Sequence, residues 1–269
     1  MPTLMNPIID TECSGWPFIR TAVAYDVADS TNDRAAELLR DERLKLPLLV
    51  WARTQTRGRG RGLNAWWSDK GSLTFTLAID PLEHQLSIEN EPRLALAIAV
   101  AVIEALNRLD LGSPALGIRW PNDLEAGGRK LGGILPERLE TPRGRLILVG
   151  IGLNVSTDLT AAPVPVRALA TSLASLHATP LDDSLPERLL PAILGQFELM
   201  LPRLAQNDQA ISVQWGRLDQ LREKWVRVDL GTHCVAGWGQ GIDRDGALCL
   251  HNGREPIRLF GGQVLRDHT

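Results

Sequence analysis

The chain has 269 residues, of which 44% are hydrophobic and 23% are charged, and this composition excludes a disordered or coiled-coil protein. Its 29 basic and 32 acidic residues leave a net charge of −3, so we expect no overall attraction to nucleic acid or to an anionic membrane. The longest apolar run, 94–103, is too short to cross a bilayer, and the first residues lack the basic and apolar segments of a signal peptide. We therefore expect a soluble, cytoplasmic protein.

The cysteines give no sign of a disulfide framework or of a metal site. Cys13, Cys234 and Cys249 are widely separated and belong to no CxxC motif and no Cys/His cluster, and the five histidines are equally scattered. No protein-bound metal is expected from these residues.

Helix and strand patterns are mixed along most of the chain. The first helix is expected at 30–39, where Ser30, Thr31 and Asn32 offer capping oxygens. The elements expected after it are strands at 46–52 and 72–79, a helix at 92–109, strands at 116–120, 129–135 and 145–155, and helices at 168–176, 186–205 and 211–221. The strand at 72–79 places four apolar residues on one face, Leu73, Phe75, Leu77 and Ile79. This order predicts an α+β domain.

The pattern changes after Trp225. Short β-like runs separated by glycine-containing turns fill 225–267 and predict a small β-barrel or sandwich. We therefore expect two domains, 1–221 and 222–269, joined near the end of the last helix.

A basic segment lies between Glu42 and Asp69 and carries a charge of +6 in a chain whose total is −3. Within it, arginines alternate with glycines in the sequence RGRGRG at 57–62. Glycines allow close approach of the backbone to a ligand, and guanidinium groups bind phosphate oxygens, so a phosphate-rich ligand fits. A mobile basic loop, or a nucleic-acid-binding RG segment, explains this stretch equally well.

Trp66 and Trp67 follow this segment directly. A large flat side chain beside an arginine cluster can stack on adenine, but neighbours on a strand point to opposite faces, so at most one of the two is expected to face a ligand. Packing in the core is the alternative for either.

The run WPNDLEAGGRKLGGIL at 120–135 predicts a β-hairpin that turns at Gly127 and Gly128. A regular register places Glu125 opposite Lys130 and Asp123 opposite Gly132, with Asp123 diagonal to Lys130. This face then holds a carboxylate, a lysine and an empty space for a ligand. A solvent-exposed Glu125–Lys130 ion pair is the competing explanation.

Five segments together resemble the ordered motifs of biotin protein ligases, over almost the whole chain: STN at 30–32, QTRGRGRG at 55–62 with Trp66, RWPND at 119–123, GRKLGGIL at 128–135 and GIGLNV at 150–155. The resemblance implies a mixed sheet flanked by helices, like that of class II aminoacyl-tRNA synthetases, with a small C-terminal β-barrel. It also implies the chemistry: biotin is joined to the α-phosphate of ATP, with Mg²⁺ on the nucleotide, and biotin is then transferred to a lysine of a biotin carrier domain of a carboxylase.

The resemblance further implies roles for individual residues. Those expected at biotin are Ser30, Thr31, Asn32, Gln55, Gly58, Arg59, Gly60, Arg61, Lys130, Gly132 and Gly133. Those expected at the nucleotide are Arg59, Arg61, Trp66, Asn122, Lys130 and Asn154. The catalytic residues are expected to be Lys130, Arg61 and Asp123, the last orienting or deprotonating the incoming lysine amine.

The sequence also departs from the family pattern. Gly62 to Ala65 stand where many relatives carry further basic residues, and Arg119 replaces a commoner lysine. The residues before Ser30 are too few for a winged helix-turn-helix domain, so we expect no operator binding. A monomer and a homodimer are both compatible with the sequence. A lipoate or octanoate ligase of the same fold, and a non-catalytic nucleic-acid binder, are the alternative functions.

Overall fold

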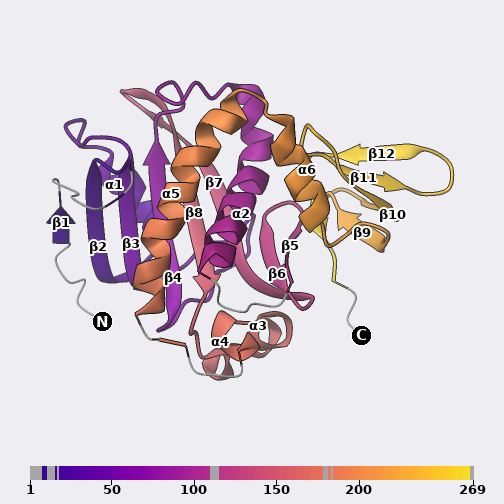
Figure 1. Ribbon diagram of the computed structural model, residues 1–269, viewed down its shortest axis with the longest axis horizontal. Helices are drawn as coiled ribbons and strands as arrows, with labels where there is room; N and C mark the ends of the chain where they lie inside the picture. Colours follow the sequence, from indigo (N-terminus) through magenta and orange to yellow (C-terminus); the bar gives the residue numbers. More distant parts are fainter. Residues whose placement is uncertain are drawn as a thin grey trace.

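The computed structural model describes residues 8–10, 16, 18–109, 115–177, 181–182 and 184–266. Cys13 lies outside these residues, and Cys234 and Cys249 are free thiols. Within the described part, the chain forms one large mixed sheet, one smaller antiparallel sheet and helices on both faces of the large one (Figure 1). None of these helices combines the length and the apolar character needed to cross a bilayer.

The large sheet contains eight described strands, in the order β1 (Ile8–Asp10), β2 (Thr21–Ala28), β3 (Leu48–Gln55), β4 (Ser72–Ile79), β8 (Gly144–Asn154), β7 (Arg129–Thr141), β6 (Asp123–Ala126) and β5 (Leu116–Arg119). Only β2 and β3 pair in parallel among these strands. The strands expected from the sequence are confirmed, but β2 was not expected. Its sequence, TAVAYDVA, does carry a strand signal, with Thr, Val, Tyr and Val at alternate positions, although the three alanines weaken it.

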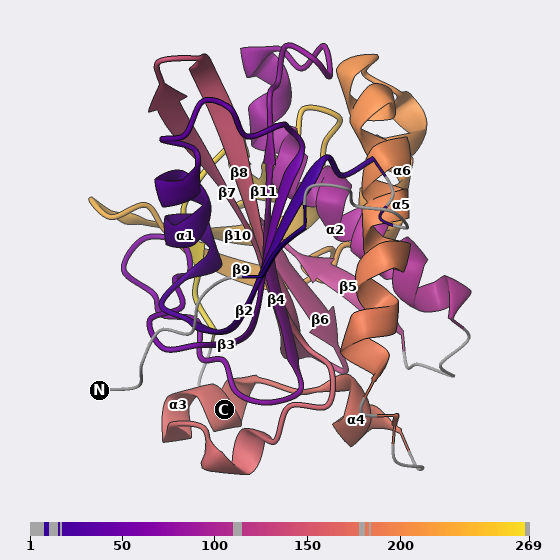
Figure 2. The same ribbon diagram turned by 90° about the vertical axis from the view of Figure 1, so that its left-hand side faces the viewer.

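Helices cover both faces of the large sheet (Figure 2). On one face lie α2 (Glu91–Arg108) and α5 (Leu185–Ala205), packed against the apolar side of β4 that carries Phe75 and Leu77. On the other face lies α1 (Thr31–Leu38), in a smaller cluster with Leu48 and Val50. The apolar face of β4 that was predicted from the sequence therefore packs against α2 and α5.

Between β8 and α5 the described residues form three short helices, and no continuous helix spans 168–176. The short helices there are η2 (Leu159–Ala161), α3 (Val164–Leu169) and α4 (Leu173–Leu176), and η1 (Ile88–Asn90) precedes α2. The helix expected at 168–176 is wrong because Ala170 is extended and the N–H of Thr171 donates to the carbonyl of Lys130 at 2.8 Å. This contact ties the segment to β7 and so to the cavity described below.

The C-terminal strands follow α6 (Gln209–Leu218) and form an open sheet. Their spatial order is β12 (Pro256–Leu259), β11 (Leu248–His251), β10 (Cys234–Ile242), β9 (Trp225–Asp229) and β13 (Gln263–Val264). The expected β-barrel is wrong, because β12 and β13 form opposite edges of the sheet and do not pair. Closure fails because β13 has only two residues, after which the chain runs back to the large sheet.

The second sheet packs on the same core as the first. Val226 and Leu250 belong to the cluster that also contains Trp120 and Trp215, and Trp215 donates from Nε1 to the carbonyl of Asp243 at 3.1 Å. A boundary at residue 221 stays a prediction.

Candidate active site

A cavity of about 730 Å³ opens where the end of β3, the start of α1, the hairpin of β6 and β7, and β8 meet. It is lined by these residues expected from the sequence: Ser30, Thr31, Asn32, Gln55, Arg59, Gly60, Arg61, Trp66, Asn122, Asp123, Lys130, Gly133 and Asn154. Gly58 and Gly132 are not among the lining residues, because Gly58 packs against the carbonyl of Trp66 and Gly132 against that of Gly152. Segments that are distant in the sequence therefore converge on one space, which has both charged and apolar surface.

The start of α1 is fixed by hydrogen bonds that reach across to β3 and β4. Ser30 caps the helix, and Gln55 Oε1 accepts from both the N–H (2.7 Å) and the hydroxyl (3.2 Å) of Thr31. Thr76 on β4 donates to Thr31 Oγ1 at 2.8 Å and contacts Asn32 Oδ1. Because the oxygen of Gln55 is used by the protein, its Nε2 is the donor left for a ligand.

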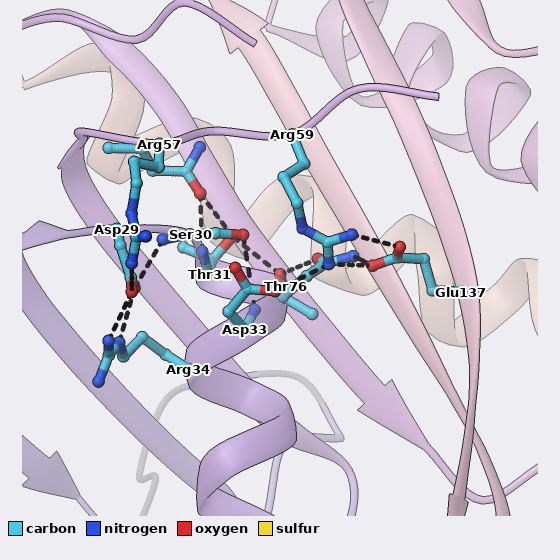
Figure 3. Close-up of polar contacts among 11 residues, drawn as sticks. Asp29, Ser30, Thr31, Asp33, Arg34, Arg57, Arg59, Thr76 and Glu137 are labelled. Atoms are coloured by element: carbon cyan, nitrogen blue, oxygen red, sulfur yellow. Dashed lines mark hydrogen bonds and ion pairs between the residues drawn. The ribbon is translucent and has the colours of Figure 1, made fainter. Parts of the chain in front are cut away.

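The arginine loop, residues 56–65, is tied down by its own arginines (Figure 3). Arg59 forms a bidentate pair with Glu137 at 2.7 and 2.6 Å and also contacts Asp33 at 2.9 Å. These carboxylates raise the pKa of Arg59, the Glu137 hydrogen bond most. Arg57 pairs with Asp29 at 2.9 Å. Two of the three loop arginines are therefore already bound to carboxylates.

Arg61 is the loop arginine with a different partner. Its guanidinium donates to the carbonyl of Gly262 in the C-terminal segment. Burial lowers the pKa of Arg61, and the nearby charge of Asp123 opposes this shift. A cation that is partly desolvated and faces a cavity is well placed to bind an anion.

The hairpin turns at Gly127 and Gly128 as expected, but its register is irregular. Glu125 lies opposite Lys130, whereas Asp123 lies opposite Gly133, so the predicted pairing with Gly132 is wrong. A β-bulge at this point adds one residue to β7. At the bulge, the Lys130 carbonyl accepts its hydrogen bond from the distant Thr171, outside the ladder.

The bulge leaves the predicted pair of side chains together. Lys130 Nζ lies 2.6 Å from Asp123 Oδ1, with 33% and 22% of the two side chains exposed. The alternative Glu125–Lys130 pair is wrong, because Glu125 is buried and accepts from Arg266 at 2.5 Å instead. The lysine and the carboxylate thus face the cavity as one ion pair.

Two glycines of β8 make room for the side chains opposite them. A Cβ on Gly150 would overlap Asn32 Oδ1, and a Cβ on Gly152 would overlap the ring of Trp66. Trp66 and Trp67 both line the cavity, and which of them faces a ligand stays a prediction. The two residues are not part of a regular strand, and the alternation of strand faces does not apply to them.

Two buried polar atoms of residues that line the cavity have no hydrogen-bond partner within the described protein. They are Asn154 Oδ1 and Trp66 Nε1, although Asn154 donates from Nδ2 to the carbonyl of Thr171 at 3.0 Å. Asn122 donates from Nδ2 to the carbonyl of Ile134 at 2.8 Å, which leaves its Oδ1 for a ligand. Buried polar groups are normally satisfied, so these atoms are candidates for ligand contacts.

One wall of the cavity comes from a C-terminal segment that was not assigned to the site from the sequence. Residues 262–266, after β12, complete the lining. Arg119 donates to the carbonyl of Leu265 at 3.1 Å, and Arg266 pairs with Glu125. Arg266 is separated from the hairpin by about half the chain, and no motif marks it, so only the tertiary structure reveals this contribution.

Comparisons with known proteins agree with this geometry. The family model "Biotin/lipoate A/B protein ligase family" matches residues 24–154. The chain is 33% identical over 224 residues to the biotin--[acetyl-CoA-carboxylase] ligase of Mycobacterium tuberculosis, covering 81% of this chain and 78% of that protein. It is 33% identical over 161 residues to the bifunctional ligase/repressor BirA of Bacillus subtilis, covering 60% of this chain but only about half, 48%, of the relative.

Solved structures share the fold. The biotin protein ligase of Aquifex aeolicus, in complex with biotin and ATP, superposes with a TM-score of 0.75 at 22% identity, covering 91% of this chain and 97% of that one. A Helicobacter pylori biotin acetyl coenzyme A carboxylase synthetase gives 0.59 at 23% identity, covering 88% and 98%. With the match to the mycobacterial ligase over most of both chains, these findings show that the protein belongs to the biotin protein ligase family.

Proposed function

We propose that this protein activates biotin with ATP, forming biotinyl-5'-AMP, and then transfers biotin to a lysine of a carrier protein. The observation that carries the proposal is the Lys130–Asp123 pair, which faces the same cavity as Arg61. A lysine, a carboxylate and a partly buried arginine in one cavity are the groups that both half-reactions need.

Biotin binds at the α1 end of the cavity in this proposal. Gln55 Nε2 and the hydroxyl of Ser30 offer polar groups for the ureido ring, and Thr31 orients Gln55. The backbone of Gly58 to Arg61, with Asn32, closes over the ligand, while Gly133 leaves space along β7 and Gly132 allows β7 to approach β8 closely. Apolar side chains such as Ile151 line the same cavity and suit the hydrocarbon part of the ligand.

Activation requires two anions to approach each other. An oxygen of the biotin carboxylate bonds to the α-phosphorus, and pyrophosphate leaves with the electron pair of the broken P–O bond. Lys130 and Arg61 supply the positive charge, each worth on the order of 4 kcal/mol at 4 Å and an effective dielectric near 20, before desolvation is subtracted. Arg59 contributes its backbone and its link to Glu137 rather than a free charge.

The nucleotide occupies the other side of the cavity. Trp66 is placed to stack on adenine, and Asn154 Oδ1 accepts a hydrogen bond from the nucleotide. Mg²⁺ bound to the phosphates lowers their charge, and the oxygens of Asn122 and Asp123 are of the hard type that this ion prefers. The partner-free Oδ1 of Asn154 and the oxygen left open on Asn122 fit these roles.

Transfer uses Asp123 together with Lys130. The amine of the acceptor lysine bonds to the acyl carbon, AMP leaves with the electron pair of the C–O bond, and the amine loses a proton. Asp123 orients this amine and accepts the proton, and Lys130 holds Asp123 in place at 2.6 Å. The acceptor is a biotin carrier domain of a carboxylase, and the protein acts in the cytoplasm as a monomer or homodimer, without binding DNA or membranes.

The same site could accept lipoate or octanoate, and substrate tests separate these acids from biotin. Pyrophosphate release is measured with ATP and each acid in turn, and we expect release with biotin. Lys130→Ala should slow release by at least about a hundredfold, whereas Lys70→Ala, which changes an exposed lysine outside the cavity, should not. Release with lipoate but not biotin would overturn the proposed substrate, and normal release by Lys130→Ala would remove Lys130 from the mechanism.

A nucleic-acid-binding function loses its main support in the structure. Arg57 and Arg59 are paired with Asp29 and Glu137, so the loop presents far less free positive charge than its sequence suggests. We expect little polynucleotide affinity at any salt concentration.

A further inference from the structure

Asp29 lies between β2 and α1, and its carboxylate holds two arginines (Figure 3). Arg34 donates from Nε at 2.7 Å and from Nη2 at 2.6 Å, and Arg57 donates from Nη2 at 2.9 Å. The N–H of Ser30 also donates, at 2.8 Å. These hydrogen bonds, of which those from Arg34 have the largest effect, hold the pKa of Asp29 far below its usual range. They outweigh burial, which leaves 11% of the side chain exposed and would raise that pKa. The cluster therefore keeps its charge in weakly acidic solution.

The cluster joins two segments that are neighbours only in space. The parallel pairing of β2 and β3 ends at Ala28 and Gln55. Beyond that point, the N–H of Thr56 donates to the carbonyl of Ala28 and the N–H of Arg57 donates to that of Asp29, both at 2.9 Å. Arg57 is thus bound to Asp29 through its main chain and through its side chain.

Each of the joined segments carries part of the cavity wall. Thr31 follows Asp29 by two residues, and Gln55 precedes Arg57 by two residues. These two wall residues are linked directly, because Gln55 Oε1 accepts two hydrogen bonds from Thr31. Hydrogen bonds weaken steeply with distance and angle, so a small relative shift of the segments would turn Gln55 Nε2 away from the cavity.

The guanidinium of Arg57 itself stays outside the cavity. Its side chain is 77% exposed, and Arg57, Asp29 and Arg34 are all absent from the lining, in contrast to Arg61. A contact between Arg57 and either substrate therefore does not follow from its place in the RGRGRG sequence.

We propose that Arg57 is a positioning residue that acts through Asp29. It holds the start of α1 against the root of the arginine loop, and so it sets the affinity for biotin without touching biotin or ATP. The proposal rests on the proposed function, because the affected property is the KM for biotin. The three loop arginines then have different roles. The side chains of Arg57 and Arg59 bind carboxylates of the protein, and that of Arg61 binds a substrate.

Steady-state kinetics of the full chain test this role. Arg57→Ala should raise the KM for biotin about three- to tenfold, as expected for one charge-assisted contact with an exposed partner, with kcat and the KM for ATP unchanged. Arg57→Lys should restore part of the loss. Arg53→Ala is the matched control, since Arg53 lies on β3 just before the loop, pairs with the surface carboxylates of Asp26 and Glu187, and rests on the ring of Trp51.

A double-mutant cycle identifies the partner. Asp29→Asn should raise the KM for biotin, and adding Arg57→Ala to it should cause no further rise, because the contact is already lost. An unchanged KM for biotin in Arg57→Ala overturns the proposal, and so does a raised KM for ATP, which would make Arg57 a nucleotide ligand. Additive effects would also overturn it.

Hydrogen exchange separates this proposal from the proposed function. In the ligand-free protein, Arg57→Ala should speed exchange at the amides of residues 56 and 57, whereas Arg53→Ala should not. If the wild-type chain fails to release pyrophosphate with biotin, the proposed function fails. The exchange measurement still tests whether Arg57 holds the two segments together. Unchanged exchange at both amides would show that the side chain of Arg57 does not hold the segments together.

Discussion

Replacing Asp219 by asparagine is expected to stabilise the protein above pH 6 and to leave its stability unchanged below pH 4. Asp219 follows α6, at the junction with the second sheet, where the chain bridges to Ile118 at the edge of the large sheet. Its Oδ1 accepts from the N–H of Leu221 at 2.9 Å, but its Oδ2 is buried without a hydrogen-bond partner. Burial raises the pKa of Asp219 to about 6, against the weaker opposing effects of the Leu221 hydrogen bond, Arg222 and Lys224.

The sign and size of the effect follow from this raised pKa. Below the unfolded pKa of 3.8 the group is protonated in both states, and the favourable burial of its neutral form is fully present. As the pH rises through the folded pKa, the carboxylate must be buried charged, and that stability is lost. A shift of about two pKa units corresponds to about 3 kcal/mol of unfolding free energy. Asparagine cannot ionise, so Asp219→Asn escapes this loss at neutral pH.

Urea unfolding between pH 3.5 and pH 8, followed by tryptophan fluorescence, measures the difference. Asp208→Asn is the matched control, because Asp208 caps the opposite end of α6 and Arg203 lowers its pKa. Its replacement should therefore destabilise the protein at neutral pH, and this loss should fade as acid protonates the wild-type carboxylate. A constant difference between Asp219→Asn and wild type at all pH values would refute the burial argument, as would a loss of stability at pH 8.

Three further predictions concern the cavity. Gly152→Ala should displace the ring of Trp66 and raise the KM for ATP about tenfold or more, because the added Cβ overlaps that ring. The control is Gly216→Ala, whose added Cβ meets nothing within 4 Å. An unchanged KM for ATP in Gly152→Ala would count against the placement of adenine on Trp66. Trypsin should cut after Arg61 more slowly when biotin and ATP are both present, since ordering of the glycine-rich loop accompanies binding; equal cleavage rates would contradict this. EDTA should stop pyrophosphate release and added Mg²⁺ should restore it, because the triphosphate needs the cation; full activity in excess EDTA would exclude that need.

The positive charge counted along the arginine segment differs from the positive charge that the fold leaves unpaired there. In the sequence, the segment between Glu42 and Asp69 holds six cations and no anion, which suggested a concentrated positive potential. In the fold, Asp29 and Glu137 come from other strands or turns and neutralise Arg57 and Arg59. A local count of charge therefore overstates the cationic surface, because the carboxylates that balance it are distant in the chain.

The hairpin was predictable because its parts are local. The turn at Gly127 and Gly128 and the contact between Lys130 and Asp123 depend on residues within a few positions of each other. The bulge was not predictable, because it is caused by the segment around Thr171, some forty positions away. The sequence thus brought Lys130 and Asp123 together correctly, although the register assumed for them was wrong.

The amino-acid sequence by itself determined most of the helices and strands and most of the residues that meet in the cavity, because periodic burial and short motifs lie within single segments. Only the tertiary structure decided the partners of the loop arginines, the open second sheet and the wall formed by residues 262–266. Each of these depends on contacts between groups separated by tens to hundreds of positions, and such contacts form only when packing of the shared core brings the distant segments together.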